Sequence, residues 1–249
     1  EKKDSKWINL ADYDKSAKAL VQNKKTEWGL SEKTSFRCKN ETPKTDNLGF
    51  KHYRFAQLYD GIKIEGATWL VHEKNGIAKT ANGYLVKDLN LSTTPSLSEE
   101  QALQYALATV KAETFAWEED AYETILRETD ENATFYPKGE LVIVSPDFAR
   151  GNASAESYRL AYKFDVFAVE PLSRDYIYVD AQNGDIITSS TLIKDTDVTA
   201  SGNGMYACQN PLSFTADRVN DDFYRLRNSK GNGICTYDAE NSYSNATVD

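Results

Sequence analysis

The first periodic run of apolar residues lies between residues 10 and 28. Its members fall near helical spacing: Leu10, Tyr13, Ala17, Leu20, Val21 and Trp28. Gly29 follows them, and glycine readily adopts the left-handed conformation that ends a helix. The spacing predicts a helix over 10–28. Residues 31–49 are polar and contain Pro43 and Gly49, which predicts a connection.

From Phe50 to Leu85 the period changes to two, as expected for strands with one buried face. The alternating residues are Tyr53, Phe55, Gln57 and Tyr59, then Ile62, Ile64, Trp69 and Val71. Three dipeptides typical of hairpin turns lie in this stretch: Asp60-Gly61, Asn75-Gly76 and Asn82-Gly83. The sequence therefore predicts a three-stranded antiparallel meander.

A second helix is predicted to begin after Ser98, which forms a capping box with Gln101. One face of this helix is apolar, with Ala102, Leu103, Ala106, Leu107 and Val110. Strand character follows around 122–126, and further strands are predicted at 140–145, 157–169, 175–179 and 185–190. The turn before the last of these is Asn183-Gly184.

A helix followed by hairpin-linked strands occurs twice, which predicts an α+β fold. We expect two consecutive modules, 1–95 and 96–191, each with a helix and an antiparallel sheet. From Leu192 to Asp249 glycine and asparagine become frequent. Short strands at 205–208, 223–226 and 234–237 would make this C-terminal segment β-rich.

Charge and apolar content narrow the class of protein. The chain has 249 residues, with 29 Lys and Arg against 38 Asp and Glu, so its net charge is -9. An acidic chain without a basic stripe is not built to bind nucleic acid. No apolar run approaches the roughly 18 to 20 residues needed to span a bilayer. No apolar stretch follows Glu1, so the chain is either cytosolic or has lost a leader before Glu1.

Catalytic chemistry is hard to place on this sequence. The two histidines are His52 and His72, and His72-Glu73 lacks the second histidine of an HExxH helix because Gly76 stands at that position. We interpret His72 as a strand residue beside a hairpin and His52 as a half-buried surface residue. The nucleophile elbow, the dinucleotide fingerprint and the P-loop are all missing. The acidic run Glu118-Glu119-Asp120 is interpreted as a solvated face. We therefore assign no catalytic and no metal-binding residue.

The three cysteines form no CxxC pair, which disfavours a structural zinc site. Cys208 and Cys235 are the candidates for one disulfide in an oxidising compartment, and this would leave Cys38 unpaired.

Three blocks, taken in order, resemble the precursors of thermolysin-like zinc metalloproteases. Residues 52–103, with Tyr59-Asp60-Gly61, Ile64-Glu65-Gly66 and Val71-His72-Glu73, are similar to the fungalysin/thermolysin propeptide (FTP) segment. Residues 160–190 resemble the end of a PepSY domain. Residues from Gly202 to Ala239 are similar to the first strands of the mature protease.

The resemblance implies an FTP-like module at 1–95, a PepSY-like module at 96–191 and an incomplete mature domain at 192–249. It also implies a secreted bacterial pro-region, whose partner is the cognate catalytic domain and whose roles are to block the cleft and assist folding. Zinc and calcium are expected only in the full-length protease, because the chain stops before the family's zinc helix. The alternative is a free-standing secreted FTP/PepSY protein that inhibits proteases in trans. An active enzyme is the third and least favoured reading, because the ligands are missing.

Processing is expected between about 189 and 197, where the resemblance places the start of the mature domain. The apolar pair Leu192-Ile193 lies in a polar joint and suits the primed side of a thermolysin-like cleft. The predicted processing region is Ser190, Thr191, Leu192, Ile193 and Lys194. Exposed joints adopt an extended form with little loss of contacts. The alternative is that Leu192 and Ile193 extend the preceding strand.

Overall fold

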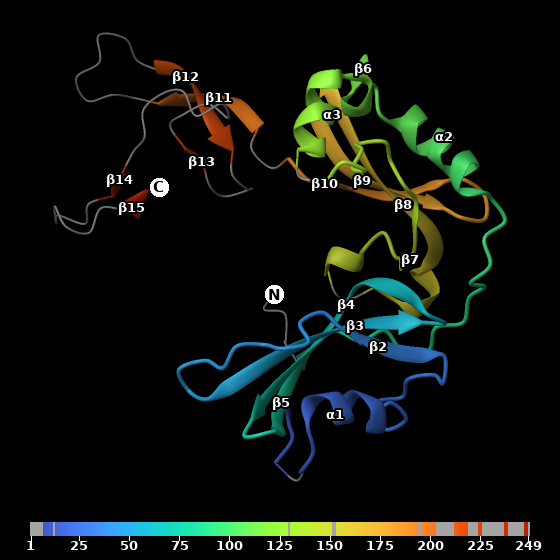
Figure 1. The fold of residues 1–249 in the computed structure, drawn as a ribbon, viewed down its shortest axis with the longest axis vertical. Coiled ribbons are helices and arrows are strands. Elements are labelled where there is room, and N and C mark those ends of the chain that lie inside the picture. The colour runs from blue at the N-terminus through green and yellow to red at the C-terminus, as the bar shows by residue number, and fades with distance from the viewer. Residues whose placement is uncertain are drawn as a thin grey trace. The chain divides into compact units, whose positions relative to one another are not determined.

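The computed structural model describes residues 7–11, 13–128, 130–150 and 153–193, and the strands among 196–248 that are given below. Two compact units are present, Glu1–Ser190 and Thr191–Asp249. The first unit contains a ten-stranded sheet that is mostly antiparallel, together with three α-helices (Figure 1). The predicted α+β class is therefore correct.

The first helix, α1 (Ala17–Asn23), is much shorter than the predicted helix over 10–28. The preceding residues bind the sheet instead, because β1 (Ile8–Asn9) pairs with β5 (Ile77–Gly83) and the Leu10 amide donates to the carbonyl of Lys79. Ser16 caps the helix by accepting the Ala19 amide at 3.3 Å. Gly29 has a φ of +70°, so the predicted left-handed residue lies after a turn and not at the helix end.

The predicted meander is present as β3 (Phe50–Tyr59), β4 (Ile62–Lys74) and β5. Asp60-Gly61 and Asn75-Gly76 have the positive φ values of tight hairpin turns. The expected hairpin at Asn82-Gly83 is wrong, because β5 ends there. A Cβ atom on Gly83 would lie 2.2 Å from the carbonyl oxygen of Thr68.

Two other predictions fail for tertiary reasons. The predicted connection 31–49 contains a strand, β2 (Thr34–Cys38), because it pairs with β3 at the edge of the sheet. The predicted strand at 122–126 is the helix α3 (Asp120–Arg127). The side chain of Tyr122 packs on Phe135 and Phe167, and Glu123 is buried against the 134–135 backbone.

The second helix, α2 (Glu99–Thr109), begins with the predicted capping box of Ser98 and Gln101. It is followed by β6 (Thr114–Phe115), the short 3-10 helix η1 (Ala116–Glu118) and α3. The remaining strands of the unit are β7 (Glu140–Val144), β8 (Arg159–Glu170), β9 (Ser173–Asp180) and β10 (Ile186–Thr191). Two 3-10 helices, η2 (Phe148–Arg150) and η3 (Ala155–Ser157), lie between β7 and β8.

One sheet runs through both predicted modules. The strand order is β1-β5-β4-β7-β8-β9-β10, and β4 pairs in parallel with β7 through Lys63 and Ile64. One buried cluster contains Ile64 and Ala67 from β4 together with Leu103 of α2 and Phe164 of β8. Residues 1–190 therefore form one unit in which β4 belongs to both halves of the sheet.

The helices α1 and α2 lie on the same side of the sheet, whereas Tyr122 of α3 packs on Phe167, which lies on the opposite side of β8 from Phe164. The residues Ala17, Leu20 and Val21 of α1 pack on Phe55, Trp69 and Val71, and those of α2 pack on the alternate residues of β8 and β9. In Figure 1 the sheet curves with α1 and α2 on its outer side. We call the opposite side of the sheet the open face; His52, Arg54, His72, Lys163 and Tyr176 lie on it.

In the second unit the described elements are all strands. The first three are β11 (Thr196–Gly202), β12 (Leu212–Arg218) and β13 (Tyr224–Arg225), which form one antiparallel sheet. A second pair is made by β14 (Tyr237–Asp238) and β15 (Thr247–Val248).

Candidate functional site

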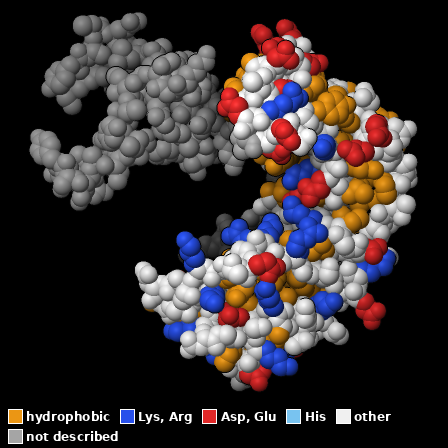
Figure 2. All heavy atoms as spheres, in the orientation of Figure 1, with side chains coloured by type: hydrophobic (Ala, Val, Ile, Leu, Met, Phe, Trp, Pro, Cys, Tyr) orange, Lys and Arg blue, Asp and Glu red, His pale blue; other side chains and the backbone are white. Residues whose placement is uncertain are grey.

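The open face carries polar and charged side chains, which alternate along each strand with residues that face the core. In β3, Phe55 is buried against α1, and its neighbour Arg54 is therefore exposed on the opposite side. In β8, Tyr162 and Phe164 are buried with α2, and Lys163 between them points to the open face. Figure 2 shows Lys and Arg side chains gathered on the hollowed side of residues 7–193.

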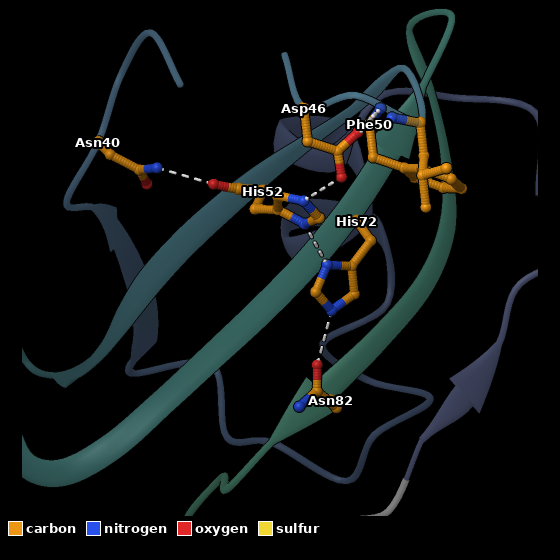
Figure 3. A network of polar contacts seen from close by, with 7 residues as sticks. Asn40, Asp46, Phe50, His52, His72 and Asn82 are labelled. Carbon is orange, nitrogen blue, oxygen red and sulfur yellow. Dashed lines mark hydrogen bonds and ion pairs between the residues drawn. The ribbon is translucent and has the colours of Figure 1, made fainter. Parts of the chain in front are cut away.

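A histidine pair occupies the β3–β4 part of this face. His52 and His72 are directly opposite each other in the antiparallel register, and their Nδ1 atoms are 2.6 Å apart. The Nε2 atom of His52 lies 3.0 Å from a carboxylate oxygen of Asp46, and Nε2 of His72 lies 2.8 Å from Oδ1 of Asn82 (Figure 3). Four side chains, from the loop before β3 and from β3, β4 and β5, thus form one chain of polar contacts.

The loop before β3 is built to hold Asp46 in place. Its other carboxylate oxygen accepts the amides of Leu48 and Phe50 at 2.9 and 2.8 Å. These backbone bonds, and then the contact with His52, lower the pKa of the Asp46 carboxyl below 3.8. Asn40 fixes the same region, since its amide group donates to the carbonyl of His52 and accepts from the amide of Arg54.

Aromatic rings flank both imidazoles. The ring of Trp7 stacks on His72 with centroids 5.1 Å apart, and Phe50 stacks on His52 at 6.4 Å. The ammonium group of Lys74 lies 5.1 Å from the centre of the Phe50 ring. The indole of Trp7 is more than half exposed.

A second polar cluster joins the two halves of the sheet. Glu65 of β4 accepts from Lys63 at 2.7 Å and from Lys163 of β8 at 3.2 Å. Burial raises the pKa of the Glu65 carboxyl, but the two lysines outweigh it and the net shift is downward. Lys163 also lies 3.9 Å from the centre of the Tyr176 ring, a cation–π distance. This cluster is built for stability and for a charged surface, and no reaction follows from it.

The histidine pair was missed by sequence reasoning, which placed His52 and His72 on separate strands without partners. Near the Asp60-Gly61 turn, Leu58 pairs with Lys63, and continuing that register would place Trp69 opposite His52. An irregularity between Ala56 and Leu58 shifts the register by three residues and brings His72 there instead. The shift arises in β4 between Lys63 and Thr68, the stretch that contains Gly66. The Asp60-Gly61 turn therefore does not predict it.

The other predicted site residues are only partly placed. Ser190 and Thr191 belong to β10, and Leu192 and Ile193 follow its end with intermediate exposure, so neither extends the strand. Lys194, Cys208 and Cys235 lie outside the described residues. Cys38 is in β2 as a free thiol of intermediate exposure. Within the described part of the chain, no group of three His, Cys, Asp or Glu could hold a metal ion, and no helix has the length and apolarity to cross a bilayer.

A comparison with known protein families matches the part of the chain that contains the histidine pair. The fungalysin/thermolysin propeptide motif matches residues 41–85, a range that includes Asp46, His52, His72 and Asn82. Neutral protease B of Bacillus subtilis is 31% identical over 204 residues, which are 80% of this chain and 32% of that protein. Thermolysin of Alicyclobacillus acidocaldarius is 26% identical over 209 residues, or 79% of this chain and 35% of that protein. The chain spans about a third of the length of these relatives.

Proposed function

We propose that the chain is the pro-region of a thermolysin-like zinc metalloendopeptidase. It contains a fungalysin/thermolysin propeptide motif, and its sequence is similar to those of thermolysins and bacillolysins. The observation that carries this proposal is the propeptide motif at 41–85. In the proposal the pro-region blocks the cleft of the cognate catalytic domain and assists its folding. Zinc and calcium are bound by that domain and not by the pro-region.

The open face is the surface proposed to meet the catalytic domain. The other face is occupied by α1 and α2, whose apolar residues are buried in the sheet. On the open face, Arg54 is exposed, and Lys163 with Tyr176 supplies a cation beside an aromatic ring. Aromatic and arginine side chains are the residues that most often dominate protein interfaces.

A covalent link between the pro-region and the catalytic domain is part of the proposal, and such a link would favour inhibition. A segment covalently linked to the catalytic domain has a high effective concentration at its cleft, and protease clefts bind extended peptide. We propose that Ser190–Lys194 is the segment processed, that 96–191 corresponds to a PepSY module, and that 192–249 begins the mature domain. The precursor is proposed to be secreted by a bacterium.

Processing is tested by N-terminal sequencing of the mature protease released from the full precursor. The expected N-terminus lies between 189 and 197. A mature N-terminus before Asp185 or after Gly204 would contradict the proposed cleavage.

Inhibition is tested by adding the purified chain to the cognate catalytic domain and measuring hydrolysis of a peptide substrate. The wild-type chain is expected to inhibit, and Arg54→Glu to weaken inhibition by about tenfold or more, since 1.4 kcal/mol of lost binding is a factor of ten. Lys111→Glu is the matched charge reversal, on an exposed residue just after α2, and should leave inhibition unchanged. Full proteolysis in excess chain would refute the inhibitory role.

The trans-acting alternative is separated from the cis role by the coding sequence. A reading frame that continues past Asp249 into an HExxH helix supports a precursor. A stop codon directly after Asp249, combined with inhibition by the separate chain, would favour the free-standing inhibitor.

A further inference from the structure

The contacts of the histidine pair fix where its protons are. The Oδ1 atom of Asn82 can only accept, so Nε2 of His72 carries a hydrogen and donates to it at 2.8 Å. The Asp46 carboxylate can likewise only accept, so Nε2 of His52 donates to it at 3.0 Å. Both imidazoles therefore use their outer nitrogens as donors.

The number of protons at the inner nitrogens then decides whether the pair is stable. With one proton between the two Nδ1 atoms, one imidazole is charged and donates to the other across 2.6 Å. With none, the contact closes only if the hydrogen of His72 moves from Nε2 to Nδ1 and the Asn82 amide turns to donate to Nε2, while His52 keeps its hydrogen on Nε2 toward Asp46. With two, both Nδ1 atoms carry hydrogens, neither finds an acceptor, and two cations face each other.

We infer that His52 and His72 form an acid-sensitive clasp, which ties β3 to β4 while it holds at most one proton and opens when the second proton binds. The first proton is compensated by the Asp46 carboxylate and by the rings of Trp7 and Phe50. The second finds no such compensation among the described residues.

The charges around the clasp act in the same direction. From β3 and β4 the neighbouring charged side chains on this face are Arg54 and Lys74, both cations. From β5, the neighbours Thr80 and Asn82 are neutral. From the loop before β3, Asp46 is the one carboxylate that contacts the pair among the described residues. Glu73 is on the opposite side of the sheet, where it accepts the amide of Ala17.

The direction of the pH effect follows from proton counting. The folded clasp accepts one proton, whereas the unfolded chain accepts two, so the unfolded state binds more protons as the pH falls. The unfolded chain exceeds one bound proton only below about pH 6.5, the ordinary imidazole value, so stability decreases as the pH falls below it. Asp46 keeps its charge throughout the range in which imidazoles titrate, about pH 5 to 8, because its pKa is lowered from 3.8.

The test is thermal unfolding of the full chain between pH 5 and 8. Below about pH 6.5, wild type should lose about 3–5 °C of Tm per pH unit more than the double variant His52→Gln/His72→Gln, which contains no imidazole. Asp46→Asn removes the compensating carboxylate and should shift the loss to higher pH, an effect that a purely structural role of Asp46 would not produce. Parallel curves for wild type and double variant would overturn the inference.

A second measurement avoids variants that fail to fold. Titration of the two imidazoles of wild type by NMR should show proton uptake in two separate steps. Identical and independent titration of both rings would overturn the clasp.

The consequence for binding rests on the proposed function. Because the clasp is on the open face, the chain should bind the cognate catalytic domain more weakly at pH 5.5 than at pH 7.5, and the double variant should lose this difference. Absence of binding at both pH values would refute the docking proposal, while the unfolding and NMR results would still decide the clasp.

Discussion

Each half of the sheet packs against one helix on the same side, the first half against α1 and the second against α2. The opposite side differs between the two halves. In the first half, the part of β3 from Phe50 to Phe55 alternates between residues that face α1 and exposed polar residues such as His52 and Arg54, so this part has one apolar side. In the second half, residues on both sides of β7 to β9 are buried: Phe164 and Ile177 face α2, whereas Val142 and Tyr178 form a cluster on the open face. A strand that is apolar on both sides contributes to two buried clusters and stabilises the unit. A strand that is apolar on one side leaves its other side exposed for binding.

The largest effect should come from the core of the second half. Phe164→Ala removes a fully buried ring and should lower the free energy of unfolding by about 3–5 kcal/mol. The matched change in the first half is Phe55→Ala, which we expect to cost less because the buried cluster around Phe55 is smaller than the cluster around Phe164. Urea denaturation of both variants measures the difference. An equal or larger loss for Phe55→Ala would contradict the contrast between the halves.

The Gly66→Ala variant tests the junction between the halves of the sheet, which is formed by β4. Gly66 has a φ of +77°, and a Cβ atom there would lie 2.7 Å from the carbonyl oxygen of Phe148. The loss of stability should be about 2–4 kcal/mol, from strain and from a backbone displacement. The control Gly61→Ala has a φ of +80° but no atom within 4 Å, and should cost about 1–2 kcal/mol.

Cooperativity of the two halves can be followed in the same experiment. Trp69 lies in the first core and Trp117 packs against the second. If the shared strand β4 makes one folding unit, single-tryptophan versions should report the same urea midpoint. Separate midpoints would show that the halves unfold independently.

A smaller effect is expected at the ion cluster that joins β4 to β8. Glu65→Gln leaves Lys63 and Lys163 without their carboxylate and should cost about 1–3 kcal/mol at pH 7. Because the pKa of Glu65 is lowered from 4.5, its contribution is present above that value and disappears as the pH falls through the folded-state pKa. The stability difference between wild type and variant should therefore shrink as the pH falls below 4.5. A difference that stays constant through the acid range would argue against the charge as the cause.

The smallest effect compares the two helix caps. Ser98→Ala removes the capping box of α2 and should cost about 1 kcal/mol. Ser16→Ala should cost less, because Glu73 also caps α1 by accepting the Ala17 amide at 2.9 Å. Thermal unfolding of the two variants tests the order, and the reverse order would show that Glu73 does not share the role.

Local sequence signals determined much of the first unit. The Ser98 capping box, the Asp60-Gly61 and Asn75-Gly76 turns and the alternating strands are all present, because each depends on residues close together in the chain. The predicted histidine environments, by contrast, were incomplete. They depend on a register shift between Ala56 and Leu58, which is a property of the pairing of β3 with β4 and not of the residues next to either histidine.

The tertiary structure decided the rest. It shortened α1 at the N-terminal side because Leu10 bonds to the edge strand β5, and it made β2 a strand because β3 offered unpaired backbone groups. It turned 122–126 into a helix because Tyr122 and Glu123 found partners at 134–135 and 167. It also merged two predicted modules through β4 and placed His52 against His72. These outcomes depend on pairing between residues distant in sequence, where the free energy of a long-range contact outweighs the weaker local preference of the chain.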